Sequence, residues 1–158
     1  INLVSNYFWR FVMILVNKIV DLMNTNLFTI DIDDTLHNAY TLMKSENLKH
    51  LPVVNGSKIV GMLCESKVKE YILRKIYEPD QNYGEIAQNP LVEFENIVDE
   101  INHFVYPEDS VQKAVKIFTK YKASALAVVD WDMNLVGIVT NTDLLLSYHS
   151  LLEKLAQN

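Results

Sequence analysis

Three small polar side chains and one carboxylate follow directly on an apolar run in the stretch VGIVTNTDL, residues 136–144. A carboxylate has two acceptor oxygens, so Asp143 can hold the hydroxyl groups of a sugar. The backbone N–H groups in the first turn of a helix are unpaired and attract phosphate. Thr140, Thr142 and Asp143 therefore form a candidate binding site. The alternative is structural, because the same residue types cap a helix and complement its dipole.

A strand that runs straight into a helix would position these residues. Residues 135–139 are apolar, and a helical apolar pattern runs from about residue 141 to the mid-150s. Asn55-Gly56-Ser57 is a hairpin turn signal. Further strands are predicted at residues 27–32, 51–54, 58–63, 103–106 and 125–129, and further helices at residues 34–46, 66–77, 89–101 and 109–121.

The two halves of the chain share one order of elements, which is strand, helix, strand, strand, helix. A shift of 75 residues places Asp34-Thr35-Leu36 on Asp109-Ser110-Val111. One residue inserted in the second hairpin moves the shift to 76, so that residues 59–61 fall on residues 135–137. A unit of about 50 residues buries too little surface to be stable alone, so the two copies are expected to pack face to face.

This order and these residues resemble the CBS domain, which normally occurs as a tandem pair called a Bateman module. The resemblance covers about residues 20–152. Its most specific part is GIVTNTDL at residues 137–144, which is similar to the family signature G-h-h-[ST]-x-x-D-h, where h is apolar. Residues 21–23, 51–54 and 127–130 support it. The resemblance implies an α+β fold of two β-α-β-β-α repeats packed with pseudo-twofold symmetry.

The resemblance also implies a function and a set of site residues. Such pairs commonly bind AMP, ADP, ATP or S-adenosylmethionine in clefts between the repeats. By resemblance, Asp143 would hold the ribose hydroxyls, while Thr140 and Thr142 would contact ribose or phosphate. Positions in the first repeat's lead-in, including Asn26 and Phe28, and Lys49 before its second strand would line the same cleft.

The expected function is a non-catalytic regulatory module that senses an adenine nucleotide and signals to an attached or partner enzyme or transporter. The nucleotide is a regulatory ligand, and no cofactor or metal is expected to be required. We expect a homodimer formed through CBS pairs. A structural dimerisation module without ligand is the alternative.

The first repeat departs from the signature. Its ending, GMLCESK at residues 61–67, has Cys64 where the signature has threonine and Lys67 where it has aspartate. A lysine ammonium group cannot accept a hydrogen bond from ribose. We therefore expect one competent adenosine site, built on Asp143, and a second cleft that is empty or altered. Phosphate binding by Lys67 is the alternative for the second cleft.

The stretch FTIDIDDTL, residues 28–36, resembles the first motif of haloacid-dehalogenase-type phosphatases. On this hypothesis Asp31 would be the nucleophile and Asp33 the general acid and base, beside Mg²⁺. That chemistry also needs a later lysine and a downstream acidic pair, and no convincing pair follows a predicted strand. The repeat explains the same residues as a strand end and a helix cap, because they align with residues 104–111. The phosphatase is the less favoured alternative.

Composition excludes several classes of protein. The net charge of −6 over 158 residues argues against a nucleic-acid-binding surface. The single cysteine, Cys64, excludes an internal disulfide and fits a reducing, cytoplasmic compartment. The longest apolar stretch lies between Arg10 and Lys18 and has seven residues, far fewer than a membrane-spanning helix needs. The four histidines lack the spacing of zinc ligands.

The first residues form an amphipathic pattern that includes Val4, Phe8, Phe11 and Leu15. We expect a helix that packs on the domain or on a second copy, or that leads out of a domain removed from the chain. We divide the chain into this helix (1–19), a first repeat (20–77), an acidic linker (78–88) and a second repeat (89–158). Residues 78–100 carry seven acids and no lysine or arginine. Because the chain lacks an initiator methionine, we expect a fragment.

Overall fold

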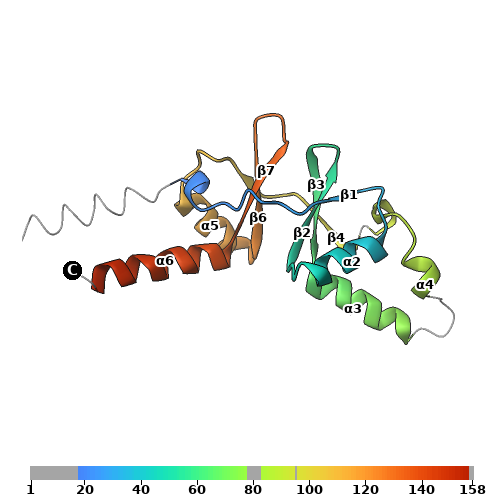
Figure 1. The fold of residues 1–158 in the computed structure, drawn as a ribbon. Helices are drawn as coiled ribbons and strands as arrows, with labels where there is room; N and C mark the ends of the chain where they lie inside the picture. Colours follow the sequence, from blue (N-terminus) through green and yellow to red (C-terminus); the bar gives the residue numbers. More distant parts are fainter. Residues whose placement is uncertain (1–17, 78–82, 95, 157–158) are drawn as a thin grey trace, which may run out of the picture. The chain divides into compact units, whose positions relative to one another are not determined.

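The computed structural model describes residues 18–77, 83–94 and 96–156 of the chain (Figure 1). Most of the predicted amphipathic helix, residues 1–19, lies outside these residues, and only its end falls within them, beside the 3-10 helix η1 (Ile19–Asp21). The elements in chain order are η1 (Ile19–Asp21), β1 (Ile30–Asp31), α2 (Leu36–Ser45), β2 (His50–Asn55), β3 (Lys58–Cys64), α3 (Glu65–Ile76), α4 (Tyr83–Ile86), η2 (Leu91–Glu93), β4 (Val98–Glu100), β5 (Phe104–Val105), α5 (Val111–Tyr121), β6 (Ala125–Val129), β7 (Leu135–Thr140) and α6 (Asn141–Ala156).

The chain forms two compact units, which are described separately. The first-repeat unit contains residues 27–102 and 132–135. The second-repeat unit contains residues up to 26, residues 103–131 and residues from 136 onward. The lead-in of a repeat is the segment just before its first strand. Up to Asn26, the first repeat's lead-in belongs to the second-repeat unit, and the second repeat's lead-in, which contains β4, belongs to the first-repeat unit.

The first-repeat unit is built on a sheet that, within the described residues, has the strand order β1-β2-β3-β4. β1 runs parallel to β2, while β2 and β3 form an antiparallel hairpin with a bulge between Val53 and Val54. Helices α2 and α3 contact β2 and β3 respectively, and they contact each other (Figure 1). The buried core consists of Ile30, Leu36, Ala39, Met43, Leu51, Val53, Leu63, Val68, Leu91, Phe94 and Ile97.

The second-repeat unit has the sheet order β5-β6-β7 within the described residues, with β5 parallel to β6. The long helix α6 continues directly from the end of β7 (Figure 1). Asn24 of the lead-in forms an antiparallel bridge with Ile138 of β7. The buried core consists of Ile19, Val105, Ala114, Phe118, Leu126, Val128 and Val139.

The two lead-ins occupy equivalent places, one beside β3 and the other beside β7. In the first-repeat unit, Asp99 of β4 pairs with Met62 of β3. The equivalent pair in the second-repeat unit is Asn24, 75 residues before Asp99, with Ile138, 76 residues after Met62, and these are the shifts found in the sequence. One glycine in each strand permits the close approach. A Cβ at Gly61 would overlap a methyl group of Val98, and one at Gly137 would lie 2.8 Å from the Met23 sulfur.

The predicted helix over residues 89–101 is wrong. The structure has only the short turn η2 there, followed by strand β4. Leu91 and Phe94 are buried, as the helical spacing required, but Val98 pairs with Leu63 of β3 instead of continuing a helix. Pairing with a distant strand therefore overrides the local helical pattern. The predicted strand at residues 27–32 is shortened to β1, and α4 was not predicted.

The stretch that resembles a phosphatase motif forms a strand end and a helix cap. Asp31 ends β1, and its Oδ1 accepts a hydrogen bond from the Asp33 N–H at 3.0 Å. Thr35 caps α2 by accepting a hydrogen bond from the Asn38 N–H at 3.2 Å. Ser110 caps α5 in the same way. The predicted caps are therefore confirmed at both repeats.

Candidate functional site

Thr140 and Asp143 hold each other at the junction of β7 and α6. The Oδ2 atom of Asp143 accepts hydrogen bonds from the Thr140 N–H and from the Thr140 hydroxyl, each at 2.7 Å. The Asp143 N–H donates to the Thr140 hydroxyl oxygen at 3.2 Å. This reciprocal arrangement is a capping box. Among the described residues, Asp143 Oδ1 accepts no hydrogen bond, so one oxygen of a fixed carboxylate remains for a ligand.

A hollow of about 300 Å³ lies beside Asp143 within the second-repeat unit. Its polar side chains are two carboxylates, from Asp21 and Asp143, and two serine hydroxyls, from Ser147 and Ser150. Its apolar side chains include Leu22 of the lead-in. This volume is at the lower end of the range for small-molecule sites. The hollow combines acceptors for ligand hydroxyls with apolar contacts, which suits a sugar better than an anion.

The lead-in beside β7 carries another of the predicted site residues. The Asn24 N–H donates to the Ile138 carbonyl at 2.9 Å, and the Ile138 N–H donates back to the Asn24 carbonyl at 3.0 Å. Asn26 is exposed, and its N–H donates to the side-chain oxygen of Asn24 at 2.9 Å. Thr142 is exposed in the first turn of α6. Asn26, Thr140, Thr142 and Asp143 therefore all belong to the second-repeat unit.

Phe28 and Lys49, the other two predicted site residues, belong to the first-repeat unit. Phe28 is exposed. The Lys49 amine is 2.7 Å from Oε2 of Glu65, and the Lys69 amine is 2.6 Å from Oε1 of the same carboxylate. Sequence reasoning missed Glu65, the one buried charged side chain among the described residues. One sequence feature could have indicated it: Glu65 and Lys69 are four residues apart, which places both side chains on one helix face.

Glu65 is held in its charged form. Hydrogen bonds from Lys49 and then from Lys69 lower its pKa from 4.5 to about 2, against the opposing effect of burial. A pKa that is lower in the folded chain than in the unfolded chain means that the ionised group stabilises the fold. This contribution is complete above pH 4.5 and is lost as the pH falls toward 2.

We expect the Glu65→Gln variant to be less stable than the parent at pH 6, and the difference to shrink as the pH falls from 5 toward 2. The amide cannot carry the charge that pairs with both lysines. Urea unfolding at several pH values measures this difference. Glu70→Gln is the control, because its exposed pair with Arg74 on the same helix contributes little. A Glu65→Gln difference that is constant with pH would contradict the assignment.

The signature position of the first repeat is occupied by an ion pair. The Lys67 amine bonds to a carboxylate oxygen of Asp99 in β4. Cys64 is partly exposed and has its sulfur 3.1 Å from the Ser66 hydroxyl. No carboxylate stands on the first turn of α3 at the place of Asp143, because Lys67 is there.

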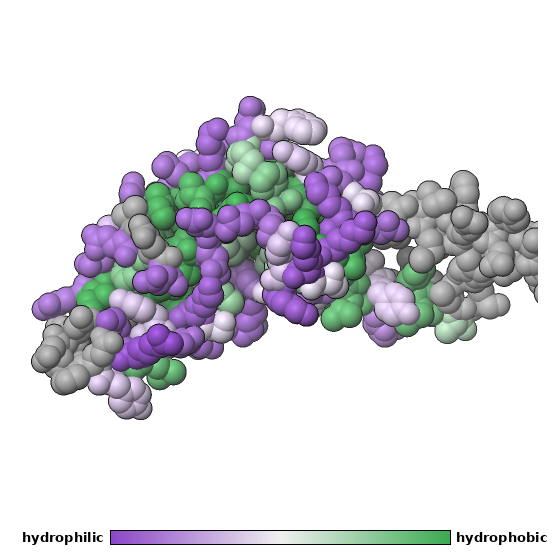
Figure 2. Space-filling model, turned by 180° about the vertical axis from the view of Figure 1, so that it is seen from behind, coloured by the Kyte–Doolittle hydropathy of each residue, from purple (hydrophilic) through white to green (hydrophobic). Residues whose placement is uncertain are grey.

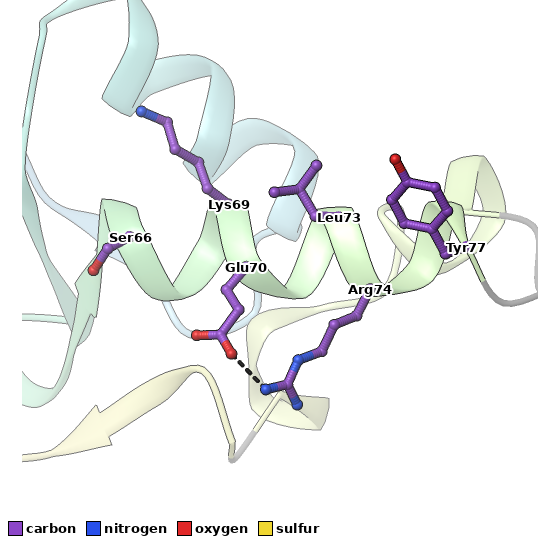
Figure 3. Close-up of a pocket in the computed structure, with 6 residues that line it drawn as sticks. All are labelled: Ser66, Lys69, Glu70, Leu73, Arg74 and Tyr77. Atoms are coloured by element: carbon purple, nitrogen blue, oxygen red, sulfur yellow. Dashed lines mark hydrogen bonds and ion pairs between the residues drawn. The ribbon is translucent and has the colours of Figure 1, made fainter.

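Another hollow, of about 670 Å³, lies elsewhere on α3. Figure 3 shows that its six labelled residues all come from this one helix, with Leu73 and Tyr77 on one side and the Glu70–Arg74 pair on the other. Because no second element supplies converging polar groups, this surface is an open helix face. Exposed apolar residues on α6 include Leu145 and Leu146. Hydrophobic patches interrupt the polar surface in Figure 2.

A family model decides the family of this chain. The model of the CBS domain matches residues 19–74 and again residues 89–150, which together make up more than half of the chain. The chain belongs to the CBS domain family. The two matches correspond to the two repeats, so the chain is a CBS pair of mixed α+β structure. CBS pairs are generally regulatory modules.

The CBS pair is similar to part of larger proteins and to solved CBS pairs. Homoserine O-acetyltransferase of Methanosarcina acetivorans is 29% identical over 122 residues, which cover 77% of this chain and 20% of that protein. The CBS domain pair of protein MJ0100, solved with 5′-methylthioadenosine and S-adenosyl-L-methionine, has a TM-score of 0.70 at 19% identity over 85% of this chain and 98% of that one. CBSX2, solved with AMP, has a TM-score of 0.69 at 17% identity over 85% and 97%.

These structural likenesses confirm the fold of a CBS pair. Among residues 18–77, 83–94 and 96–156, no helix has both the length and the apolar character needed to span a membrane.

Proposed function

We propose that this CBS pair is a non-catalytic regulatory module that binds an adenosine-containing ligand, of the AMP, ADP or ATP class, at Asp143. The observation that carries the proposal is the geometry of this carboxylate. Oδ2 is anchored by two hydrogen bonds from Thr140, while Oδ1 accepts none among the described residues. A hollow lies beside this carboxylate. A pre-oriented acceptor loses little freedom on binding, which favours affinity.

The other proposed ligand residues have different tasks. Thr140 and Thr142 supply hydroxyls near the first-turn N–H groups of α6, where a phosphate is favoured. Asn26 supplies an amide from the lead-in. Phe28, an aromatic ring, and Lys49, an ammonium group, belong to the first-repeat unit, and their binding roles stay predictions. Solved relatives that contain AMP or S-adenosyl-L-methionine support an adenosine ligand for this fold.

The mechanism is a binding equilibrium, in which no bond is made or broken. A ligand that binds one conformation of the CBS pair more tightly than another shifts the population toward the first. An attached or separate enzyme or transporter that contacts the CBS pair then responds to that shift. We also propose a homodimer, supported by the exposed apolar side chains of α6 and measurable by sedimentation velocity.

Isothermal titration calorimetry with AMP, ADP and ATP, and with GMP as the base control, tests the proposal. We expect saturable binding of one adenine nucleotide per chain. A thermal-shift measurement on the same samples should agree, because ligand at 100 times its Kd stabilises the fold by about 2.7 kcal/mol. For a chain of this size the melting temperature should then rise by about 5–10 °C.

The capping box at Thr140 also fits a purely structural module. In that case none of these nucleotides would produce saturable heat or a shift in melting temperature at millimolar concentration. That outcome would reject the adenosine site and leave dimerisation as the function.

A further inference from the structure

A second hollow, of about 260 Å³, lies in the first-repeat unit between α3 and the segment before β4. It is lined by Lys67, Glu70, Tyr71, Arg74, Asn96 and Ile97. The four residues on α3 match residues 76 positions later on α6, and Asn96 and Ile97 match residues 75 positions earlier in the first lead-in. The matching residues all line the Asp143 hollow: Asp143, Leu146, Ser147, Ser150, Asp21 and Leu22. The two hollows are therefore the same place in the two repeats.

The chemistry of the two hollows is different. The Asp143 hollow has two carboxylates and two hydroxyls, and its described lining residues include no lysine or arginine. In the first-repeat hollow, the two cations each have an acid partner, Lys67 with Asp99 and Arg74 with Glu70. Asp99 stands at the position of Asn24 in the other repeat, by the shift of 75. A ribose would therefore meet an ion pair in place of an open carboxylate oxygen.

The Lys67–Asp99 pair contributes little to the stability of the fold. Its side chains are 46% and 48% exposed. Exposed ion pairs typically contribute about 0–1 kcal/mol, because water screens the charges and two long side chains must be ordered. Stability therefore does not require this pair, while Lys67, one of its two members, lines the hollow.

We propose that the Lys67–Asp99 pair closes the first-repeat hollow to ribose, so that the charges at positions 67 and 99 set the number of adenosine sites per chain. This inference rests on the proposed function of the Asp143 hollow. It goes beyond the loss of an acceptor at Lys67, because the Asp99 carboxylate pairs with the ammonium group and offsets the positive charge that would attract a phosphate.

Transplanting the second-repeat residues into the first repeat tests the inference. The variant Cys64→Thr/Lys67→Asp/Asp99→Asn reproduces the Thr140, Asp143 and Asn24 set, including the threonine that orients the carboxylate. Calorimetric titration with AMP is expected to give two sites per chain, against one in the parent. Lys67→Asp/Asp99→Asn, with fewer changes, is a second test, and two sites are expected there as well.

Four control variants separate charge at this hollow from other effects. Cys64→Thr alone and Lys116→Gln, an exposed substitution with the same net charge change of −1, should both keep one site. Lys67→Asp alone should also keep one site, because it places a carboxylate beside Asp99. Adding Asp143→Ala to the triple variant should leave one site, now in the first repeat.

The stoichiometry distinguishes the possible failures. Two sites in the parent chain, or one site in a triple variant whose circular dichroism matches the parent, would overturn the inference and leave the Asp143 site intact. No binding to the parent chain would overturn the proposed function and the inference with it.

Discussion

Replacing Asp143 with alanine is expected to weaken AMP binding by about 10- to 150-fold. The estimate follows from the loss of a hydrogen bond to an ionised acceptor, about 1.5–3 kcal/mol, at about 1.4 kcal/mol for each factor of ten. The Asp143 carboxylate is fixed by Thr140, so its loss removes an acceptor already in position. Calorimetric titration of parent and variant with AMP measures the change directly.

Asp143 also caps α6, so its removal lowers stability as well as affinity. Asp109 offers a matched control, since its Oδ2 accepts a hydrogen bond from the N–H of Tyr106, three residues earlier, at the same 2.7 Å. Asp109→Ala should therefore cost similar stability and leave AMP affinity unchanged. Equal losses of affinity in the two variants would show that Asp143 acts only through the fold.

Replacing Gly61 with alanine is expected to lower the free energy of unfolding by about 1–3 kcal/mol, the usual range for overpacking a core. The added methyl group would overlap Val98 in β4, and it would lie 3.2 Å from the Asp99 carbonyl oxygen. Valine is stiff at its first side-chain torsion and cannot move away easily. Urea unfolding of parent and variant measures the loss.

The same substitution at Gly137 should be milder. There the added methyl group meets the Met23 side chain, whose sulfur lies 2.8 Å away and whose unbranched stem can adjust. Adding Val98→Ala to Gly61→Ala should recover part of the lost stability, because it removes the overlapping methyl group. Without such recovery, contact with β4 would not be the cause of the loss.

The repeat explains how much of the fold could be predicted from the sequence. Matching one half to the other located β2, β3, β6, β7 and α6 to within about two residues, because each has a clear apolar pattern and a turn signal. The prediction for the segment after Asn89 was wrong, because Leu91 and Phe94 have helical spacing while residues 98–100 pair with β3. Local spacing carries no information about that distant partner.

The candidate site was predictable only where its residues are close in the sequence. Thr140 and Asp143 are three residues apart, and their spacing alone indicates a cap and an acceptor. Asp99, by contrast, meets Lys67 only because β4 pairs with β3. Asp21 joins Asp143 through the fold of the lead-in, over more than 100 residues of chain. The binding roles of Asn26, Phe28 and Lys49 stay predictions.

The first lead-in belongs to the second-repeat unit, so this unit combines an earlier and a later segment of the chain. Residues 19–26 leave the ribosome more than 100 residues before β7, the strand beside which Asn24 lies. Such high contact order slows folding, and an early segment that waits for a late partner is open to chaperones and proteases in the meantime. Helix α6, which carries Asp143, therefore completes a unit to which residues 19–26 already belong.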